Sequence, residues 1–151
     1  MKYLKSYNES VQSYDWELES DNERLVKYTF EDSESNRYLV EFKNIRNGKY
    51  LGTEYELVYF VYDESVSNYN VSKIVNVNPF KISQTVFGDI LNDFLKRKSW
   101  AKVIRIEGLS KNVEKQYVSQ RTKMYMRFLE RNPIDGYRLE NYGNRINLIK
   151  I

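Results

Sequence analysis

The sequence predicts an α+β domain with a mixed, mainly antiparallel sheet. Two alternating runs, residues 25–30 and 37–42, flank a polar stretch, as in an antiparallel hairpin. Residues 79–95 instead place apolar side chains at i, i+1, i+4 and i+5, the pattern of an amphipathic helix. Because further strand and helix patterns follow without a linker, we expect the 151 residues to form a single domain.

The first segment carries apolar side chains at steps of three, four and three. They are Leu4, Tyr7, Val11 and Tyr14, and they lie on one side of a helix. We expect a short N-terminal helix within residues 1–20, acting as a docking segment or a leader, ahead of an α+β domain at residues 24–151. Its apolar side also suggests packing on a neighbouring copy of the chain.

The middle of the chain predicts two more strands and a long helix. Residues 55–62 are apolar on both faces, which favours a central strand covered on both sides. A short strand at residues 74–77 follows. Asn78 and Pro79 then suit a helix cap and first position, and the basic residues 96–98 suit the helix end.

The last third predicts a strand, a helix and a closing hairpin. Residues 102–107 read as a buried strand, which the preceding helix should place parallel to residues 74–77. Residues 112–132 predict a second helix, and residues 137–140 and 145–151 a hairpin. After the N-terminal helix, the expected order is β-β-β-β-α-β-α-β-β.

The composition excludes several kinds of chemistry. The chain has no cysteine and no histidine, which removes disulfides, thiolate nucleophiles, Ser-His-Asp triads and the usual transition-metal cages. No apolar run approaches the roughly 20 residues of a membrane span. We therefore expect no metal, no membrane contact and a location in the cytoplasm. We favour a protein that is not a catalyst.

Charge is distributed unevenly along the chain. Residues 1–75 carry 9 basic and 14 acidic side chains, whereas residues 76–151 carry 15 and 7. One interpretation is a surface for nucleic acid, a nucleotide or another anionic partner, with tyrosines such as Tyr117 stacking on bases. The other is that the two ends of one domain differ in charge. The candidate anion-binding residues are Lys81, Lys96, Arg97, Lys98, Lys102, Arg105, Arg121, Lys123 and Arg127.

Two short motifs near the end resemble the GNAT acyltransferase superfamily, and the order of elements extends this resemblance over roughly residues 24–151. Residues 121–128 are similar to the last helix of that family with its tyrosine, and residues 136–139 to the strand that follows. The resemblance implies an N-acyltransferase in which Tyr125 protonates the leaving thiolate of coenzyme A. An alternative is that Tyr125 is a core aromatic at helical spacing.

The same resemblance implies a base and a phosphate loop. Glu54 or Glu56 would be the base, and the pyrophosphate of acyl-coenzyme A would lie against a loop holding Gln84, Thr85 and Gly88. The family pattern has a glycine pair there. This chain has Gly88 alone among the bulky residues Ile82, Val86 and Phe87, which would crowd a close backbone approach. We therefore expect no bound cofactor.

A second resemblance concerns origin. Residues 77–95 and 119–125 are similar to a group of uncharacterised tailed-bacteriophage proteins, and residues 1–9 resemble the leader of proteins packaged in phage heads. This implies a phage accessory or virion-associated protein, located in the host cytoplasm or the virion, that binds other phage proteins or itself. Non-catalytic protein binding is thus the leading hypothesis, with acyl transfer and nucleic-acid binding as alternatives.

Overall fold

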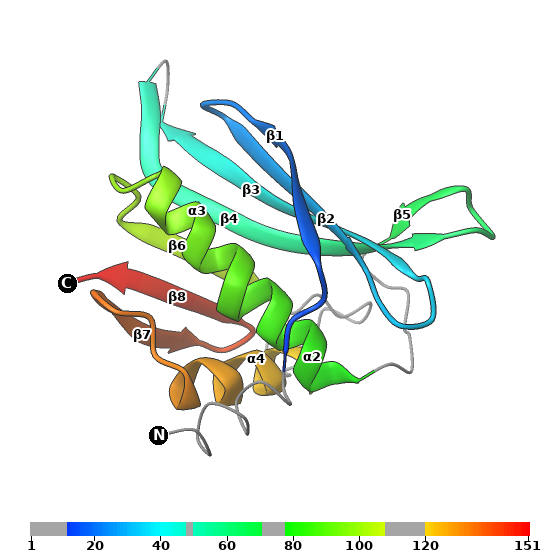
Figure 1. Cartoon of the computed structure of the whole chain (residues 1–151). Coiled ribbons are helices and arrows are strands. Elements are labelled where there is room, and N and C mark those ends of the chain that lie inside the picture. The colour runs from blue at the N-terminus through cyan, green and yellow to red at the C-terminus, as the bar shows by residue number, and fades with distance from the viewer. Residues whose placement is uncertain (1–11, 48–49, 71–77, 108–119) are drawn as a thin grey trace.

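The computed structural model describes residues 12–47, 50–70, 78–107 and 120–151, which form an α+β fold as the sequence predicts (Figure 1). Eight strands make one open, mostly antiparallel sheet in the order β1-β2-β3-β4-β6-β8-β7, and β5 pairs with β4 beside this path. The strands are β1 Trp16–Asp21, β2 Leu25–Glu31, β3 Arg37–Asn47, β4 Tyr50–Asp63, β5 Asn68–Asn70, β6 Val103–Glu107, β7 Tyr137–Tyr142 and β8 Arg145–Lys150.

Strand β1 is an element that the sequence prediction missed. Trp16 and Leu18 are half-buried between the exposed Glu17 and Glu19, so the segment alternates as an edge strand does. It pairs antiparallel with β2, from Trp16 opposite Phe30 to Asp21 opposite Val26. Part of the expected docking segment therefore belongs to the sheet itself.

A long helix between residues 79 and 97 is confirmed, and it is not regular throughout. It begins as α2 (Pro79–Ser83), widens into the π-helical segment η1 (Gln84–Ile90) and ends as α3 (Leu91–Arg97). Side chains donate to backbone carbonyls at both ends of η1. Thr85 Oγ1 donates to the Lys81 carbonyl at 2.7 Å, and the Asn92 amide donates to the Gly88 carbonyl. Such competition for helix carbonyls is a physical reason for the wider turn.

The parallel partner of β6 is β4. Glu54 lies opposite Val103, and Leu57 lies opposite Ile106. The expected parallel pairing with residues 74–77 lies outside the described residues, as do the N-terminal helix before residue 12 and residues 112–119 of the second helix. Tyr14, the last apolar position of that expected N-terminal helix, is described and is not helical.

The core lies on one face of the sheet. Tyr28, Phe42 and Tyr55 point to this face from β2, β3 and β4, and all three are fully buried. The long helix covers them, and α4 (Gln120–Arg131) packs on the same side, where Tyr125 and Phe128 contact Phe87. On the opposite face of β4 the side chains are half-buried, and no described helix lies over them, so the predicted cover on both sides is seen on one.

Candidate functional site

An acyltransferase cleft would lie between residues 74–77 and the strand that begins near Lys102. Residues 74–77 lie outside the described residues, and the described part of this region is where β6 separates from its parallel partner β4. Their pairing ends at Leu57 and Ile106, and β4 continues beyond this point. Tyr125 from α4 fills the gap, with its ring centroid 4.8 Å from that of Phe87 and 6.0 Å from that of Tyr59. A space of about 10 Å³ is left among these side chains. That is about the room for a single water molecule, so the gap among these described side chains has no room for a cofactor.

Tyr125 is protonated, as a general acid must be, but it is buried in the core. Burial, followed by the neighbouring Tyr59, raises the pKa of the Tyr125 phenol well above its ordinary value. The phenol therefore keeps its proton at neutral pH. However, Tyr125 is only 3% exposed, so no thiolate can reach it in this conformation.

The two candidate bases lie on the other face of the sheet from Tyr125. Because side chains alternate along β4, Glu54 and Glu56 point away from the face of Tyr55, Leu57 and Tyr59. The Glu54 carboxylate also forms an ion pair with Arg105 of β6. The sheet therefore separates the expected base from the expected acid, and the structure does not assemble the pair.

The expected phosphate loop is occupied by the protein itself. Thr85 is fully buried, and its hydroxyl accepts a hydrogen bond of 2.9 Å from the backbone N–H of Tyr14. A Cβ atom added at Gly88 would lie 2.4 Å from the amide nitrogen of Gln84, so the Gln84 side chain covers the one glycine. Thr85 thus holds the N-terminal segment against the helix, while Gln84 occupies the space beside Gly88.

The start of α2 has no free donors for a phosphate. The Asn78 side-chain oxygen accepts from the backbone N–H of Phe80 at 3.1 Å and of Lys81 at 3.3 Å. The Ile82 N–H donates to the Asn78 carbonyl at 3.2 Å, and Pro79 has no N–H. Since a helix binds anions through unsatisfied N–H groups, this first turn offers no such cradle.

The expected anion-binding residues do not form one surface. Lys96, Lys102, Lys123 and Arg127 are exposed, but they come from α3, the start of β6 and α4. The structure brings Arg97 and Lys98 together around Asp21, at 3.6 and 2.9 Å.

Other members of that basic set lie against aromatic rings or carboxylates. The Arg121 guanidinium is 6.0 Å from the Tyr59 ring centroid, and the Lys81 ammonium is 4.6 Å from that of Tyr14. Arg105 pairs with Glu54. Tyr117 lies outside the described residues.

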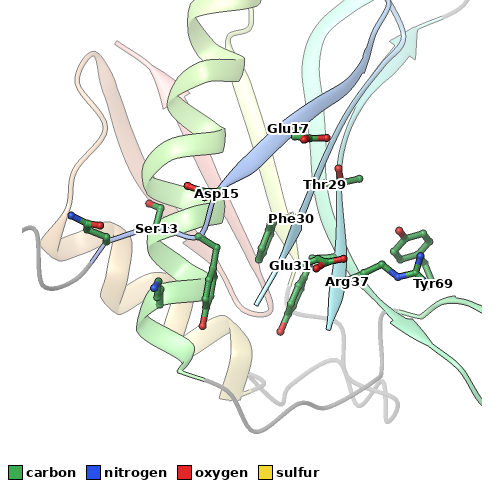
Figure 2. Close-up of a pocket in the computed structure, with 12 residues that line it drawn as sticks. Ser13, Asp15, Glu17, Thr29, Phe30, Glu31, Arg37 and Tyr69 are labelled. Carbon is green, nitrogen blue, oxygen red and sulfur yellow. The ribbon is translucent and has the colours of Figure 1, made fainter. Parts of the chain in front are cut away.

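The sequence prediction missed a hollow of about 730 Å³ between residues 12–17 and the ends of β2 and β3 (Figure 2). Its floor is aromatic. Tyr14 and Phe30 stack with centroids 6.1 Å apart, and Phe30 and Tyr38 stack at 4.5 Å. We call this space the hollow.

Charged side chains of both signs surround the hollow. Asp15, Glu17 and Glu31 line it, are exposed, and form no ion pair with any described residue. The two cations are held on rings, since Arg37 lies 4.3 Å from the Tyr62 centroid and Lys81 lies over Tyr14. In the described part of the chain, no group of acidic side chains is arranged to hold a metal ion.

Asp32 fixes the turn between β2 and β3, and the residues on either side of this turn, Glu31 and Arg37, line the hollow. Its carboxylate accepts hydrogen bonds from the Glu34 N–H (2.8 Å), the Asn36 N–H (3.0 Å), the Asn36 amide (2.8 Å) and the Tyr38 hydroxyl (2.7 Å). Burial alone would raise the pKa of the Asp32 carboxyl, but these hydrogen bonds outweigh it and hold the pKa below its ordinary value. Burial and the adjacent Asp32 raise the pKa of the Tyr38 phenol.

No family model, curated protein or solved structure matches the chain, so its function has to be inferred from the geometry of the cleft, the basic residues and the hollow. Among residues 12–47, 50–70, 78–107 and 120–151, no helix has both the length and the apolar character needed to cross a bilayer.

Proposed function

We propose that the chain is a non-catalytic protein that acts by binding a protein partner, with the hollow as the contact surface. The observation that carries this proposal is the position of Tyr125. It fills the gap between β4 and β6, and the sheet separates it from Glu54 and Glu56. The hollow, in contrast, combines an aromatic floor with accessible charges, a combination common at protein interfaces.

The charges of the hollow favour a basic segment of the partner. Arg37 and Lys81 are held over tyrosine rings, whereas Asp15, Glu17 and Glu31 have no ion pair among the described residues. An arginine or lysine side chain of the partner would pair with these carboxylates. An adjacent apolar side chain would fill the remaining space of the hollow beside its buried aromatic stack. Charge complementarity of this kind selects a partner more than it adds affinity.

The resemblance to tailed-phage proteins is the basis for proposing a setting. We place the binding role in a phage accessory or virion-associated protein, with another phage protein as partner and the host cytoplasm or the virion as location. Among the described residues of the similar segments, 78–95 and 120–125, only Lys81 lines the hollow, so these segments support the setting and not the contact surface.

The two other candidate functions have weaker support. The order of strands and Tyr125 favour an acyltransferase, but the closed cleft and the capped start of α2 oppose it. The exposed Lys123 and Arg127, four residues apart on α4, favour a nucleic acid or a nucleotide. The basic set is nevertheless spread over several elements and partly paired, so we do not adopt this function.

A titration with two blocked dipeptides tests the proposed contact surface. We expect arginine–phenylalanine to shift the backbone NMR signals of Thr29, Glu31 and Arg37 with a Kd on the order of 1 mM, and glutamate–phenylalanine to leave them unchanged. Such a Kd corresponds to about 4 kcal/mol, which suits one ion pair and one apolar contact.

Variants of the acidic rim provide the control for this titration. The double change Glu17→Gln and Glu31→Gln should weaken binding of the basic dipeptide by roughly tenfold, because two charged contacts are lost. Glu23→Gln, at the exposed turn between β1 and β2, should leave the affinity unchanged. Equal shifts with both dipeptides, or shifts only outside the hollow, would rule the proposal out.

A further inference from the structure

The two outer strands of the sheet differ in the regularity and the charge of their free edges. The strand order ends at β1 on one side and at β7 on the other. An outer strand exposes backbone N–H and C=O groups that another chain can pair with, unless the strand is made irregular or charged. Within the described part of the chain, these two strands are the ends of the main strand path, at which an additional strand can be added.

Strand β1 has features that prevent pairing with a copy of itself. Its register with β2 shifts between Leu18 and Ser20, so its edge is irregular. Glu17 and Glu19 are both exposed, and an antiparallel copy would bring these carboxylates together. Strand β7 is regular, because its pairing with β8 runs without a shift from Tyr137 to Tyr142, and its two charged side chains, Arg138 and Glu140, have opposite signs.

The hydrogen bonds of the β7–β8 hairpin show which groups face outward. The Ile151 N–H donates to the Gly136 carbonyl at 2.9 Å, which makes these two residues a hydrogen-bonded pair. Since such pairs alternate along an antiparallel ladder, Arg138 and Glu140 direct their backbone groups toward β8. Leu139 and Asn141 therefore direct theirs away from the sheet.

One register pairs β7 with a second copy of itself without placing like charges opposite each other. If the two-fold axis passes Leu139, the outward backbone groups of Leu139 meet those of the other Leu139. Arg138 then lies opposite Glu140 of the second copy, in the type of pair where side chains are closest. A register centred on Arg138 or on Glu140 would instead place like charges opposite each other.

We propose that β7 is the interface of a homodimer, in which two copies pair antiparallel about Leu139 and extend the sheet across both chains. One further observation fits this register. Arg138 and Glu140 are already held side by side within one chain, at 3.1 Å.

Sedimentation velocity over a range of protein concentrations tests the dimer. A single strand pair buries a small interface, so we expect a dissociation constant on the order of 10–100 μM. Arg138→Glu should raise it at least tenfold, because like charges then meet at both ends of the register. The double variant Arg138→Glu with Glu140→Arg restores opposite charges in the same register and should return the constant to within about threefold of the original.

A proline variant tests the backbone pairing separately. Leu139→Pro removes an N–H that faces away from β8, so the hairpin keeps its own hydrogen bonds while the dimer loses its central pair. We expect this variant to be monomeric and to keep the circular dichroism spectrum of the original protein. A monomeric original protein at 1 mM, a dimer that survives Leu139→Pro, or a double charge variant that stays as weak as Arg138→Glu would each overturn the proposal. Because the hollow is at the β1 side of the sheet, the dipeptide titration is independent of this result.

Discussion

Replacing Phe94 with alanine is expected to lower the free energy of unfolding by about 3–5 kcal/mol, the usual cost of removing a buried phenyl ring. Phe94 is fully buried on α3. Its ring stacks on Phe42 with centroids 3.9 Å apart and meets Tyr55 edge-on at 4.9 Å. The substitution therefore removes the contact that joins the long helix to β3 and β4. Urea denaturation followed by circular dichroism measures the change.

A matched substitution on the same helix is the control. Phe80 is 63% exposed in the first turn of α2, so Phe80→Ala should change the free energy of unfolding by no more than about 0.5 kcal/mol. If both variants lose similar stability, or if Phe94→Ala loses less than about 1 kcal/mol, the packing of the long helix on β3 and β4 is wrong.

Replacing Asp32 with alanine is expected to lower the free energy of unfolding by about 3 kcal/mol, because hydrogen bonds to a charged group are lost and a buried hydroxyl loses its acceptor. The hydroxyl is that of Tyr38, and the backbone N–H groups of Glu34 and Asn36 lose the same acceptor. Glu34 lies in the same turn and its side chain is exposed, so Glu34→Ala should change the free energy of unfolding by no more than about 0.5 kcal/mol. Denaturation curves of the two variants at neutral pH make the comparison.

The contribution of Asp32 should also depend on pH in a defined direction. The folded protein holds the pKa of Asp32 below the ordinary 3.8, so the unfolded chain binds the proton first as the pH falls. Stability from this carboxylate is therefore complete above about pH 5 and is lost as the pH falls through the unfolded and then the folded pKa. The difference in unfolding free energy between the original protein and Asp32→Asn should shrink between about pH 5 and 2. A difference that stays constant over this range would contradict the assigned hydrogen bonds.

Much of the fold could be predicted because local patterns and tertiary packing agree. Val26, Tyr28 and Phe30 alternate as a strand requires, and all three are buried on the helix face of β2. Asn78 and Pro79 begin the helix as their chemistry suggests. In such segments the apolar residues that repeat with the period of a strand or helix are also the residues that fill the core. The periodicity of the sequence is therefore enough to find the element.

Strand β1 was missed although the sequence carries its signal, whereas η1 has no such signal. The helical spacing of Leu4 to Tyr14 favoured a helix for the N-terminal segment, but Trp16 and Leu18 alternate with Glu17 and Glu19 as in a strand. The backbone of Tyr14 is held by Thr85, 71 residues away, and no local pattern reveals such a bond. The apolar spacing of the long helix likewise does not show that Thr85 and Asn92 donate to its carbonyls.

The candidate site was predictable in its residues and not in their arrangement. Bulky Phe87 beside Gly88 suggested a crowded region, and the structure places the Phe87 ring against Tyr125. The separation of Glu54 from Tyr125 depends on which face of β4 receives α4, which a single sequence does not specify. The hollow was missed because its walls come from three separate parts of the chain.

Calorimetric titration with acetyl-coenzyme A tests most directly whether the acyltransferase cleft is closed. The filled gap at Tyr125 and the capped start of α2 predict no saturable heat with ligand up to about 1 mM, which corresponds to less than about 4 kcal/mol of binding. A dissociation constant in the micromolar range, together with shifts in the backbone NMR signals of Gln84, Thr85 and Gly88, would contradict it.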